Sequence, residues 1–395
     1  MPARLLDDSA SALAADVIAR GPQSRPDLAE KLQLSPASMT RLQRHLIARD
    51  LINEIAAPND YGSGRPIYVL EPSPTPRTFV GIKLTGDTIY GVTTTLTCHQ
   101  NAALEYPLES RSPDDVMELT SHVINELCPN PHWVGIALAG RCYPDGRIIE
   151  AGYLGWENLD AGALLRRHYD GPATFVNDVE AVGRYEQWFG MGRAHENFST
   201  VTIGQGVGHV VIHHGRILHR GDTQLGLIGH LPLDPGSAHT CWLGHHGCAA
   251  ALLNLDYLTA RMRQASPTSQ LPSYTHGPIP SNTPGISLDP AVNWLHDCLV
   301  ANAPGAREVL TESFTNVCRL LAIIADVTVA EALSITGELV PLLTWGLGDI
   351  DTKLDNMRDP VTAPIEWKLR PATFDFWARG AAATAIRAWI PSALA

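Results

Sequence analysis

The sequence predicts an α/β protein that begins with a small helical domain. Three observations support this: two short helices with capping residues between Ser24 and Leu46, a proline-rich break at residues 71–77, and an alternation of strands and helices that restarts near Thr200. An alternation that repeats along the chain indicates an α/β domain built from two similar halves around a cleft.

Two short helices separated by a turn are predicted near the start of the chain, after a supporting helix that ends at Gly21. Ser24 and Ser35 stand at N-cap positions, and Pro26 and Pro36 fall in the first turns that follow. The second helix has an apolar stripe that consists of Met39, Leu42 and Leu46. Its opposite face is polar and suits a helix that enters the major groove of DNA.

A β-hairpin is predicted after these helices, with strands from Ile52 to Ala56 and from Ile67 to Leu70. The connection contains Gly64, Arg65 and Pro66, and its small bulk allows an arginine to reach a minor groove or a phosphate. Helix-turn-helix spacing by itself also describes a packed helical hairpin, but the added wing favours a winged-helix DNA-binding domain. The residues that we expect to contact DNA are Ser35, Ser38, Thr40, Arg41, Arg44 and Arg65.

The net charge of −12 is unfavourable for DNA binding, because basic contacts to phosphate supply much of the affinity. The distribution of the charge reduces this objection. Residues 1–72 hold eight Lys and Arg against nine Asp and Glu, whereas the rest of the chain holds 21 against 32. The N-terminal part is therefore close to neutral, and we expect dimerisation to supply further affinity for an operator.

The chain after the proline-rich break alternates strands and helices. The predicted strands are residues 78–84, 88–94, a strand near 103, 133–138, 174–176, 200–203, 207–213 and 332–336. The predicted helices are residues 114–127, 161–168, 179–189, 249–264, 289–301, 307–327 and 377–389. The predicted domains are a winged-helix domain at 1–72, a linker at 73–77, a first lobe at 78–190, and a second lobe at 191–395 with a proline-rich insertion at 266–290.

The composition indicates a globular cytoplasmic protein, because 45% hydrophobic residues in a chain of 395 suffice for more than one core. No run of about 18 apolar residues appears, and the acidic first residues do not resemble a secretory signal, so we expect no membrane segment. Seven cysteines, an odd number in a long chain, indicate reduced thiols or a metal site. We interpret the histidines from His209 to His219 as exposed hairpin residues. The cysteines that we interpret as core residues are Cys98, Cys128, Cys142, Cys298 and Cys318.

Several short motifs, in this order along nearly the whole chain, resemble the ROK family and in particular its winged-helix transcriptional regulators. These motifs are Ser24–Leu46, Gly62–Pro66, Val80–Ile82, Val176–Asp178, Gly204–Gly208, Gly229–His230, Cys241–Cys248, Ile335–Gly337 and Gly380–Ala382. The resemblance implies a winged helix-turn-helix followed by a two-lobed, actin-like (ribonuclease H-like) domain of the sugar kinase type. It also implies a homodimer or tetramer.

Kinases of this family bind Mg-ATP at glycine loops, and the chain departs from the family pattern there. Lys83 stands where the resemblance places an acid, and a lysine cannot be a Mg²⁺ ligand. We interpret Lys83 as an exposed residue at a strand end. Gln205 replaces a threonine in a glycine loop, and Glu338 replaces a glycine of the adenosine site. We therefore expect no ATP binding and no phosphoryl transfer.

The resemblance makes Asp178 the general base of a kinase and Asn177 a ligand of a sugar hydroxyl. An Asn-Asp pair before a helix equally describes a helix cap. Tyr153, Leu227 and Ala250 replace three polar sugar ligands of the family, which argues against a hexose. The residues that we expect to line an effector pocket are Trp156, Asn177, Asp178 and His230.

Zinc in this family is bound by one histidine and three cysteines, and the chain retains His230, Cys241 and Cys248. Leu243 stands at the position of the middle cysteine, although a structural zinc ion requires four nitrogen or sulfur donors. A nearby histidine can supply the fourth donor, and the alternative is a loop that folds without metal. The nearby histidines are His239, His245 and His246.

These observations predict a cytoplasmic DNA-binding transcriptional regulator, a repressor, with a kinase-like domain that is not an enzyme. Its expected partners are a duplex DNA operator, a sugar or related metabolite as effector, and further copies of the chain. Two alternatives remain, an active sugar kinase of the family and a regulator without a small-molecule ligand.

Overall fold

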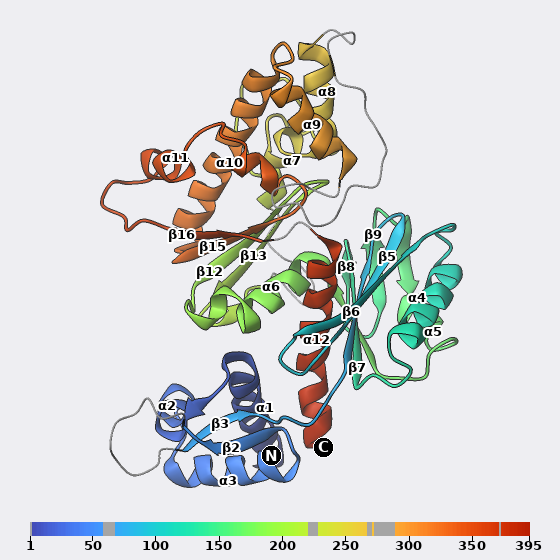
Figure 1. Ribbon diagram of the computed structural model, residues 1–395, viewed down its shortest axis with the longest axis vertical. Coiled ribbons are helices and arrows are strands. Elements are labelled where there is room, and N and C mark those ends of the chain that lie inside the picture. Colours follow the sequence, from blue (N-terminus) through green and yellow to red (C-terminus); the bar gives the residue numbers. More distant parts are fainter. Residues whose placement is uncertain (1, 58–67, 220–227, 267–270, 272–288, 371–372) are drawn as a thin grey trace. The chain divides into compact units, whose positions relative to one another are not determined.

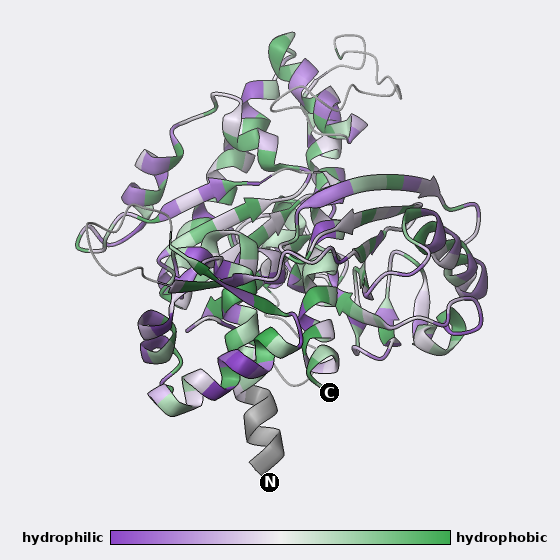
Figure 2. Cartoon of the chain, turned by 60° about the horizontal axis from the view of Figure 1, so that its bottom comes forward, coloured by the Kyte–Doolittle hydropathy of each residue, from purple (hydrophilic) through white to green (hydrophobic). Residues whose placement is uncertain are grey.

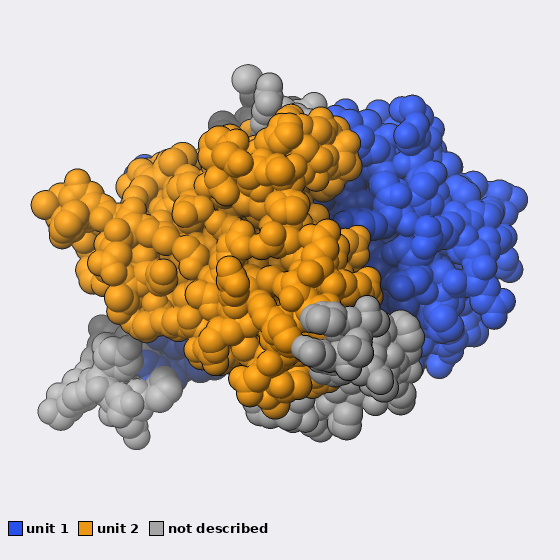
Figure 3. All heavy atoms as spheres, turned by 90° about the horizontal axis from the view of Figure 1, so that it is seen from above, with its two compact units in different colours: residues 1–193, 377–395 blue, residues 194–376 orange. Residues whose placement is uncertain are grey.

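The computed structural model of the chain describes residues 2–57, 68–219, 228–266, 271, 289–370 and 373–395 (Figure 1). The chain forms two compact units (Figure 3). Unit 1 comprises residues 1–193 and 377–395, and unit 2 comprises residues 194–376. The predicted second lobe ran to residue 395, whereas the structure assigns the last 19 residues, 377–395, to unit 1. The physical reason is that the C-terminal helix packs against the sheet of unit 1.

The N-terminal part of unit 1 contains the helices that the capping residues predict. They are α1 (Pro2–Arg20), α2 (Arg25–Lys31) and α3 (Pro36–Ala48). Ser24 Oγ accepts a hydrogen bond from Asp27 N at 3.3 Å, and Ser35 Oγ accepts one from Ser38 N at 3.2 Å. Both predicted caps are therefore confirmed.

The strands of the predicted wing are also present, as β2 (Ile52–Ala56) and β3 (Tyr68–Pro72), which pair antiparallel. A two-residue strand, β1 (Gln23–Ser24), pairs with β3 and was too short for its periodicity to be recognised. The connection between the wing strands, which holds Arg65, lies outside the described residues. Helices and strands share one buried core, which includes Leu13, Val17, Leu28, Leu42, Leu46 and Leu70.

The main sheet of unit 1 has the strand order β11-β7-β4-β5-β6. Its strands are β4 (Phe79–Leu84), β5 (Thr88–Thr94), β6 (Gln100–Pro107), β7 (Trp133–Leu138) and β11 (Ala173–Asn177). The pairs β4 with β5 and β5 with β6 are antiparallel, and β7 is parallel to both β4 and β11. The accompanying helices are α4 (Pro113–Leu127), α5 (Ala161–Leu165) and α6 (Asp178–Phe189). These elements confirm the predicted order, although α5 ends three residues early.

A small antiparallel sheet in unit 1 was not predicted. It consists of β8 (Arg141–Cys142), β9 (Arg147–Ala151) and β10 (Trp156–Asp160). Its outer strand β10 has mostly exposed or half-buried residues, so it lacks a clear apolar alternation.

The sheet of unit 2 repeats the plan of the first, with the order β14-β13-β12-β15-β16. Its strands are β12 (Phe198–Ile203), β13 (Val207–His213), β14 (Arg216–Ile217), β15 (Ala332–Thr336) and β16 (Glu366–Leu369). In both sheets three consecutive strands pair antiparallel. A later strand then pairs in parallel with the first of these three, and the last strand pairs in parallel with that later strand. The predicted restart near Thr200 is therefore confirmed.

The helices of unit 2 differ from the prediction in two places. They are α7 (Ala249–Leu252), α8 (Leu255–Ala265), α9 (Pro290–Val300), α10 (Ala306–Thr328) and α11 (Ile350–Met357). The predicted single helix at 249–264 is wrong, because Asn254 starts a new helix by accepting a hydrogen bond from Tyr257 N at 2.7 Å. Helix α11 was not predicted. Most of the predicted insertion at 266–290 lies outside the described residues.

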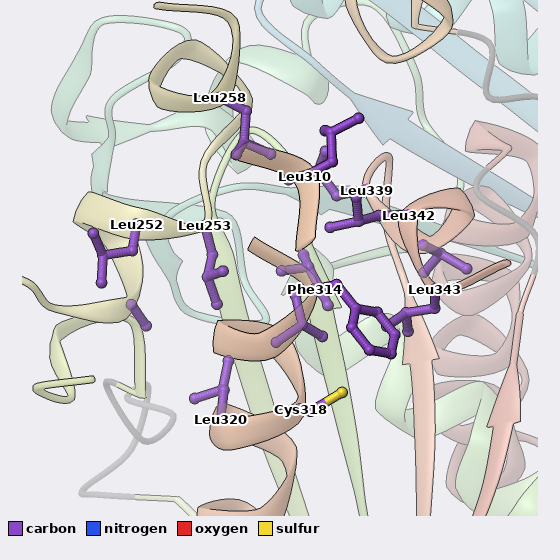
Figure 4. Close-up of a cluster of buried hydrophobic side chains, with 14 of the residues drawn as sticks. Leu252, Leu253, Leu258, Leu310, Phe314, Cys318, Leu320, Leu339, Leu342 and Leu343 are labelled. Carbon is purple, nitrogen blue, oxygen red and sulfur yellow. The ribbon is translucent and has the colours of Figure 1, made fainter. Parts of the chain in front are cut away.

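Helix α10 organises the core of unit 2. Phe314 and Leu310 are completely buried on this helix, and Figure 4 shows Phe314 among leucines contributed by other elements. Most helices carry both hydrophilic and hydrophobic residues (Figure 2), as expected for helices that bury one face. Among the helices that the structure describes, none is long and apolar enough to cross a membrane.

Helix α12 (Phe374–Leu394) lies directly on the sheet of unit 1, with no side chain between the two backbones at two glycines. A Cβ at Gly81 on β4 would overlap the carbonyl oxygen of Ala378 and lie 2.7 Å from Ala382 N. A Cβ at Gly135 on β7 would overlap the carbonyl oxygen of Ala381. Gly81 and Gly135 are paired across the two strands, so together they define where α12 contacts the sheet.

We expect Gly135→Ala to lower the free energy of unfolding by about 1–3 kcal/mol, because the added methyl must push α12 away from β7. Urea denaturation followed by circular dichroism measures the change. Gly152→Ala is the matched control, since nothing lies within 4 Å of a Cβ at Gly152. Equal unfolding midpoints for the two variants would contradict the close contact.

Candidate functional site

The polar face of α3 is exposed. Thr40, Arg41 and Arg44 are exposed and Ser38 is half-buried. Neither Arg41 nor Arg44 has a hydrogen bond or an ion pair to any residue that the structure describes. The Ser35 hydroxyl is committed to the helix cap, so it orients α3 in addition to any contact with DNA.

The other basic residues of this region hold the domain together. Arg20 donates to Asp16 at 3.1 Å, and Lys31 pairs with the same carboxylate. Arg25 pairs with Glu54 on the wing strand β2. These internal pairs leave the α3 face as the basic surface among the described residues of the domain.

Asn177, predicted both as a sugar ligand and as a helix cap, serves as the cap of α6. Its Oδ1 accepts hydrogen bonds from Val179 N at 2.9 Å and Glu180 N at 3.1 Å. Its Nδ2 donates to the Gly140 carbonyl at 2.9 Å. Both ends of the Asn177 amide therefore have partners within the chain.

Asp178, the position of a kinase general base, forms a buried ion pair with Lys83. Lys83 is 4% exposed and Asp178 is 7% exposed, so the interpretation of Lys83 as an exposed lysine is wrong. Lys83 Nζ donates to Asp178 Oδ2, and Val179 N donates to Asp178 Oδ1 at 2.9 Å. Lys83 Nζ also lies 5.2 Å from the ring centroid of Trp377, the geometry of a cation–π contact.

A signal for the burial of Lys83 existed in the sequence. Lys83 lies within the apolar run Phe79–Leu84, which becomes β4 at the centre of its sheet, and every residue of this strand is buried. No signal in the sequence pointed to the contact between Trp377 and Lys83. Trp377 lies some 290 residues after Lys83, on the C-terminal helix, and the contact depends on how that helix packs.

Trp156, another predicted pocket residue, is 3% exposed and belongs to a hydrophobic core. Its Nε1 donates to the Arg111 carbonyl at 2.8 Å. Tyr153, which replaces a polar sugar ligand, is 52% exposed. Each of the three predicted pocket residues in unit 1, Trp156, Asn177 and Asp178, therefore has a hydrogen-bond partner within the chain.

The second glycine loop, residues 204–206, lies in unit 2 between β12 and β13. A Cβ at Gly204 would overlap the Glu338 carboxylate, so this carboxylate fills the space beside the loop. Gln205 donates to Asp289 Oδ2 at 3.5 Å, which brings a second acid to the loop. Carboxylates in these positions disfavour an anionic phosphate, because like charges repel.

Four side chains in unit 2 converge on a candidate metal site: His230, Cys241, His245 and Cys248. Their donor atoms all lie within 4.8 Å of one another. His230 Nδ1 is 3.7 Å from Cys241 Sγ and 4.0 Å from Cys248 Sγ. The three predicted ligands therefore come together, and His245 is the histidine that completes the group.

The local backbone explains this convergence. Two isolated β-bridges, Pro232 with Cys248 and Thr240 with His246, hold the arms of the loop together. Gly244 and Gly247 have positive φ angles of 80° and 56°, which a tight turn requires and glycine tolerates. Leu243, at the position of the family cysteine, is 59% exposed and is not a member of the donor group.

Burial, hydrogen bonds and neighbouring donors shift the pKa values of Cys241, Cys248 and His230. Burial opposes thiolate formation, but hydrogen bonds from the backbone at Leu243 and His245 lower the pKa of Cys241 below its ordinary value. Burial and the neighbouring Cys241 raise the pKa of Cys248. Burial, followed by the proximity of His245, lowers the pKa of His230, which favours the neutral imidazole that binds metals.

Other histidines and cysteines have structural roles. The interpretation of His209 as exposed is wrong, because it is 5% exposed and burial lowers its pKa to about 4. Among the remaining cysteines Cys128 is half-buried, and the others are buried. The buried ones are Cys98, Cys142, Cys298 and Cys318.

Comparison with known proteins extends the similarity over most of the chain. The family model described as "ROK family" matches residues 79–341. The DNA-binding transcriptional repressor Mlc of Escherichia coli is 25% identical over 268 residues, which are 65% of this chain and 65% of Mlc. The chain thus aligns with slightly less than two thirds of that relative. A glucokinase of Thermotoga maritima is 26% identical over 161 residues, which are 40% of this chain and 50% of the glucokinase.

A solved structure extends the likeness to the N-terminal domain. The crystal structure of a ROK family transcriptional regulator, a homologue of E. coli Mlc, has a TM-score of 0.75 and 20% identity and covers 99% of this chain and 98% of its own. At this identity the likeness shows the fold, and it confirms the predicted fold class. With two similar α/β sheets, a helical N-terminal region and a family match over residues 79–341, this chain belongs to the ROK family.

Proposed function

We propose that the protein is a DNA-binding transcriptional repressor whose ROK domain does not transfer phosphate. The observation that carries the proposal is the exposed face of α3, a helix whose N-cap is Ser35. On this face Arg41 and Arg44 form no hydrogen bond or ion pair with any described residue. The alignment with the repressor Mlc supports the same function. In this proposal α3 is the recognition helix, and Ser35, Ser38 and Thr40 contact DNA with the arginines of α3 and with Arg65.

We propose residues 1–72 as the DNA-binding domain and residues 73–77 as its linker to the ROK lobes. A single small domain of near-neutral charge binds DNA weakly. A homodimer or tetramer in the cytoplasm, with two domains about 34 Å apart, would bind two half-sites of a duplex operator. Dimerisation thus supplies the affinity for DNA that the near-neutral charge of a single domain cannot supply.

The absence of phosphoryl transfer is supported by two internal contacts. Asp178 is paired with Lys83 and therefore has an internal cation where a kinase base requires a substrate hydroxyl. Glu338 fills the space beside Gly204, where a phosphate would approach. An active sugar kinase is the alternative that the alignment with a glucokinase favours.

Incubation of the pure protein with Mg-ATP and a panel of hexoses should therefore yield no sugar phosphate in a coupled assay. A substrate would have to break the buried Lys83–Asp178 pair before the carboxylate could accept a proton. ATP consumption that depends on one sugar would contradict the non-catalytic assignment.

The effector assignment of Trp156, Asn177, Asp178 and His230 stays a prediction. The internal partners of the first three favour the second alternative, a regulator without a small-molecule ligand. Thermal unfolding with sugars and metabolites distinguishes the two, because a ligand at 100 times its Kd adds about 2.7 kcal/mol of stability.

We propose that zinc is bound by His230, Cys241, His245 and Cys248, and that it stabilises the loop. The chemistry of this donor set, two sulfurs and two imidazoles, fits tetrahedral zinc. Metal analysis of the purified protein should give about one equivalent of zinc, and His245→Ala should reduce it below about half an equivalent. His246→Ala is the matched control, since His246 lies outside the group. Equal zinc content in the two variants would remove His245 from the ligand set.

Arg44→Ala and Arg65→Ala should each weaken binding to an operator selected from random DNA by about 1–3 kcal/mol, because each removes a phosphate or base contact. Fluorescence anisotropy measures the affinity, and circular dichroism checks the fold. Arg216→Ala, an exposed arginine of unit 2, is the control. If neither variant weakens binding, the assignment of the DNA-binding surface is wrong.

A further inference from the structure

Helix α12 begins, within unit 1, at the buried ion pair. Trp377 is 7% exposed and its ring lies 5.2 Å from Lys83 Nζ, while Lys83 holds Asp178. The same ammonium group contacts both Asp178 and the Trp377 ring. A change that breaks the bond between Lys83 and Asp178 is therefore expected to alter the position of this ammonium group relative to the Trp377 ring. The first turn of α12 in unit 1 thus senses the state of this ion pair.

The middle of α12 has no freedom to absorb such a change locally. Its backbone contacts Gly81 and Gly135 of the sheet, as described above, and a Cβ at Gly380 would lie 2.6 Å from the carbonyl carbon of Ala181 on α6. Backbone contacts without intervening side chains cannot adapt by rotamer changes. We therefore expect a strain at Trp377 to be transmitted along α12 to Trp389, before Pro391, rather than to be absorbed by side-chain rearrangement.

The other end of α12 contacts the winged-helix domain and its linker. Trp389 packs edge-on against Phe79 at 5.4 Å between ring centroids, and the Arg77 guanidinium lies 5.3 Å from the Trp389 ring. Residues of α12 and of the winged-helix domain belong to one buried core. From α12 this core includes Ile386, Trp389, Ile390 and Leu394, and from α1 and α3 it includes Leu13, Val17, Leu42 and Leu46.

Arg77 contacts both Trp389 of α12 and Asp50, which lies at the end of α3. Its Nη2 donates to the Asp50 carbonyl at 2.7 Å and to Asp50 Oδ2 at 3.0 Å. Asp50 follows directly after Arg49, the C-cap of α3. The Asp50 carboxylate also accepts a hydrogen bond from Ser73 at 2.7 Å, so the end of α3 is tied to the linker from two sides.

We propose that α12 and Arg77 connect the Lys83–Asp178 pair to the recognition helix, so that the state of the pair sets the position of α3. Trp377 and Trp389 are 12 residues apart, about 18 Å along the helix. Lys83 is then a positioning residue of the DNA-binding domain.

The proposal rests on the proposed function for the meaning of α3, but hydrogen exchange tests it without DNA. Lys83→Met removes the cation from the pair at one end of the connection. Amide exchange of peptides covering residues 46–52, at the other end, should become at least threefold faster in the full-length variant. Lys368→Met is the matched control, since Lys368 is a lysine of unit 2 that pairs with Glu366 among the described residues.

Two further variants keep the test decisive. Lys83→Met with Asp178→Asn removes both charges, and it replaces the single variant if an unpaired buried carboxylate prevents folding. In an Arg77→Gln background, the effect of Lys83→Met on residues 46–52 should disappear. Faster exchange that is confined to residues near 83, 178 and 377, or an undiminished effect in the Arg77→Gln background, would overturn the proposal.

Operator binding separates this proposal from the proposed function. If the wild-type protein binds no duplex while the exchange of residues 46–52 still responds to Lys83→Met, the connection exists and the DNA-binding function is wrong. If the wild-type protein binds DNA but the exchange does not respond, the connection is wrong and the DNA-binding function stands.

Discussion

The buried ion pair between Lys83 and Asp178 is the interaction on which the functional interpretation of unit 1 depends. Removing ionised groups from water is costly, and in proteins the cost is tolerated when the charges are paired and hydrogen-bonded. Lys83 and Asp178 meet both conditions, because Asp178 accepts from Lys83 and from Val179 N while Lys83 also faces the Trp377 ring. The Asp178 carboxylate therefore has an internal cation and an internal N–H donor as its partners.

The close contact of α12 with the sheet gives this ion pair consequences beyond its own site. Gly81 and Gly135 allow two backbones to touch, and the helix then extends from Trp377 into the core that it shares with α1 and α3. The N-terminal domain is therefore held by more than its linker, since residues of α12 share a buried core with α1 and α3. A regulator requires such a connection if events in the ROK domain are to reach DNA.

The metal loop shows how a departure from a family pattern can be compensated nearby. Leu243 cannot bind a metal and is largely exposed, yet His245, two residues later, joins His230, Cys241 and Cys248. Gly244 and Gly247, which flank this stretch with positive φ angles, allow the tight turn that holds His245 near the other three donors. The number of donors is retained although their identity changes, whereas at the second glycine loop the Glu338 carboxylate fills the space beside Gly204.

The sequence by itself determined the elements whose signals are local. The caps at Ser24 and Ser35 and the repeated strand order follow from neighbouring residues, because capping and periodicity act within a few positions of the chain. Only the tertiary structure decided what depends on partners distant in the sequence: Lys83 pairs with Asp178 and faces the Trp377 ring, and Asn177 is a cap whose amide also reaches Gly140. The same holds for the choice of His245 among three neighbouring histidines, since the convergence of donor atoms is a property of the folded loop and has no counterpart in spacing along the chain.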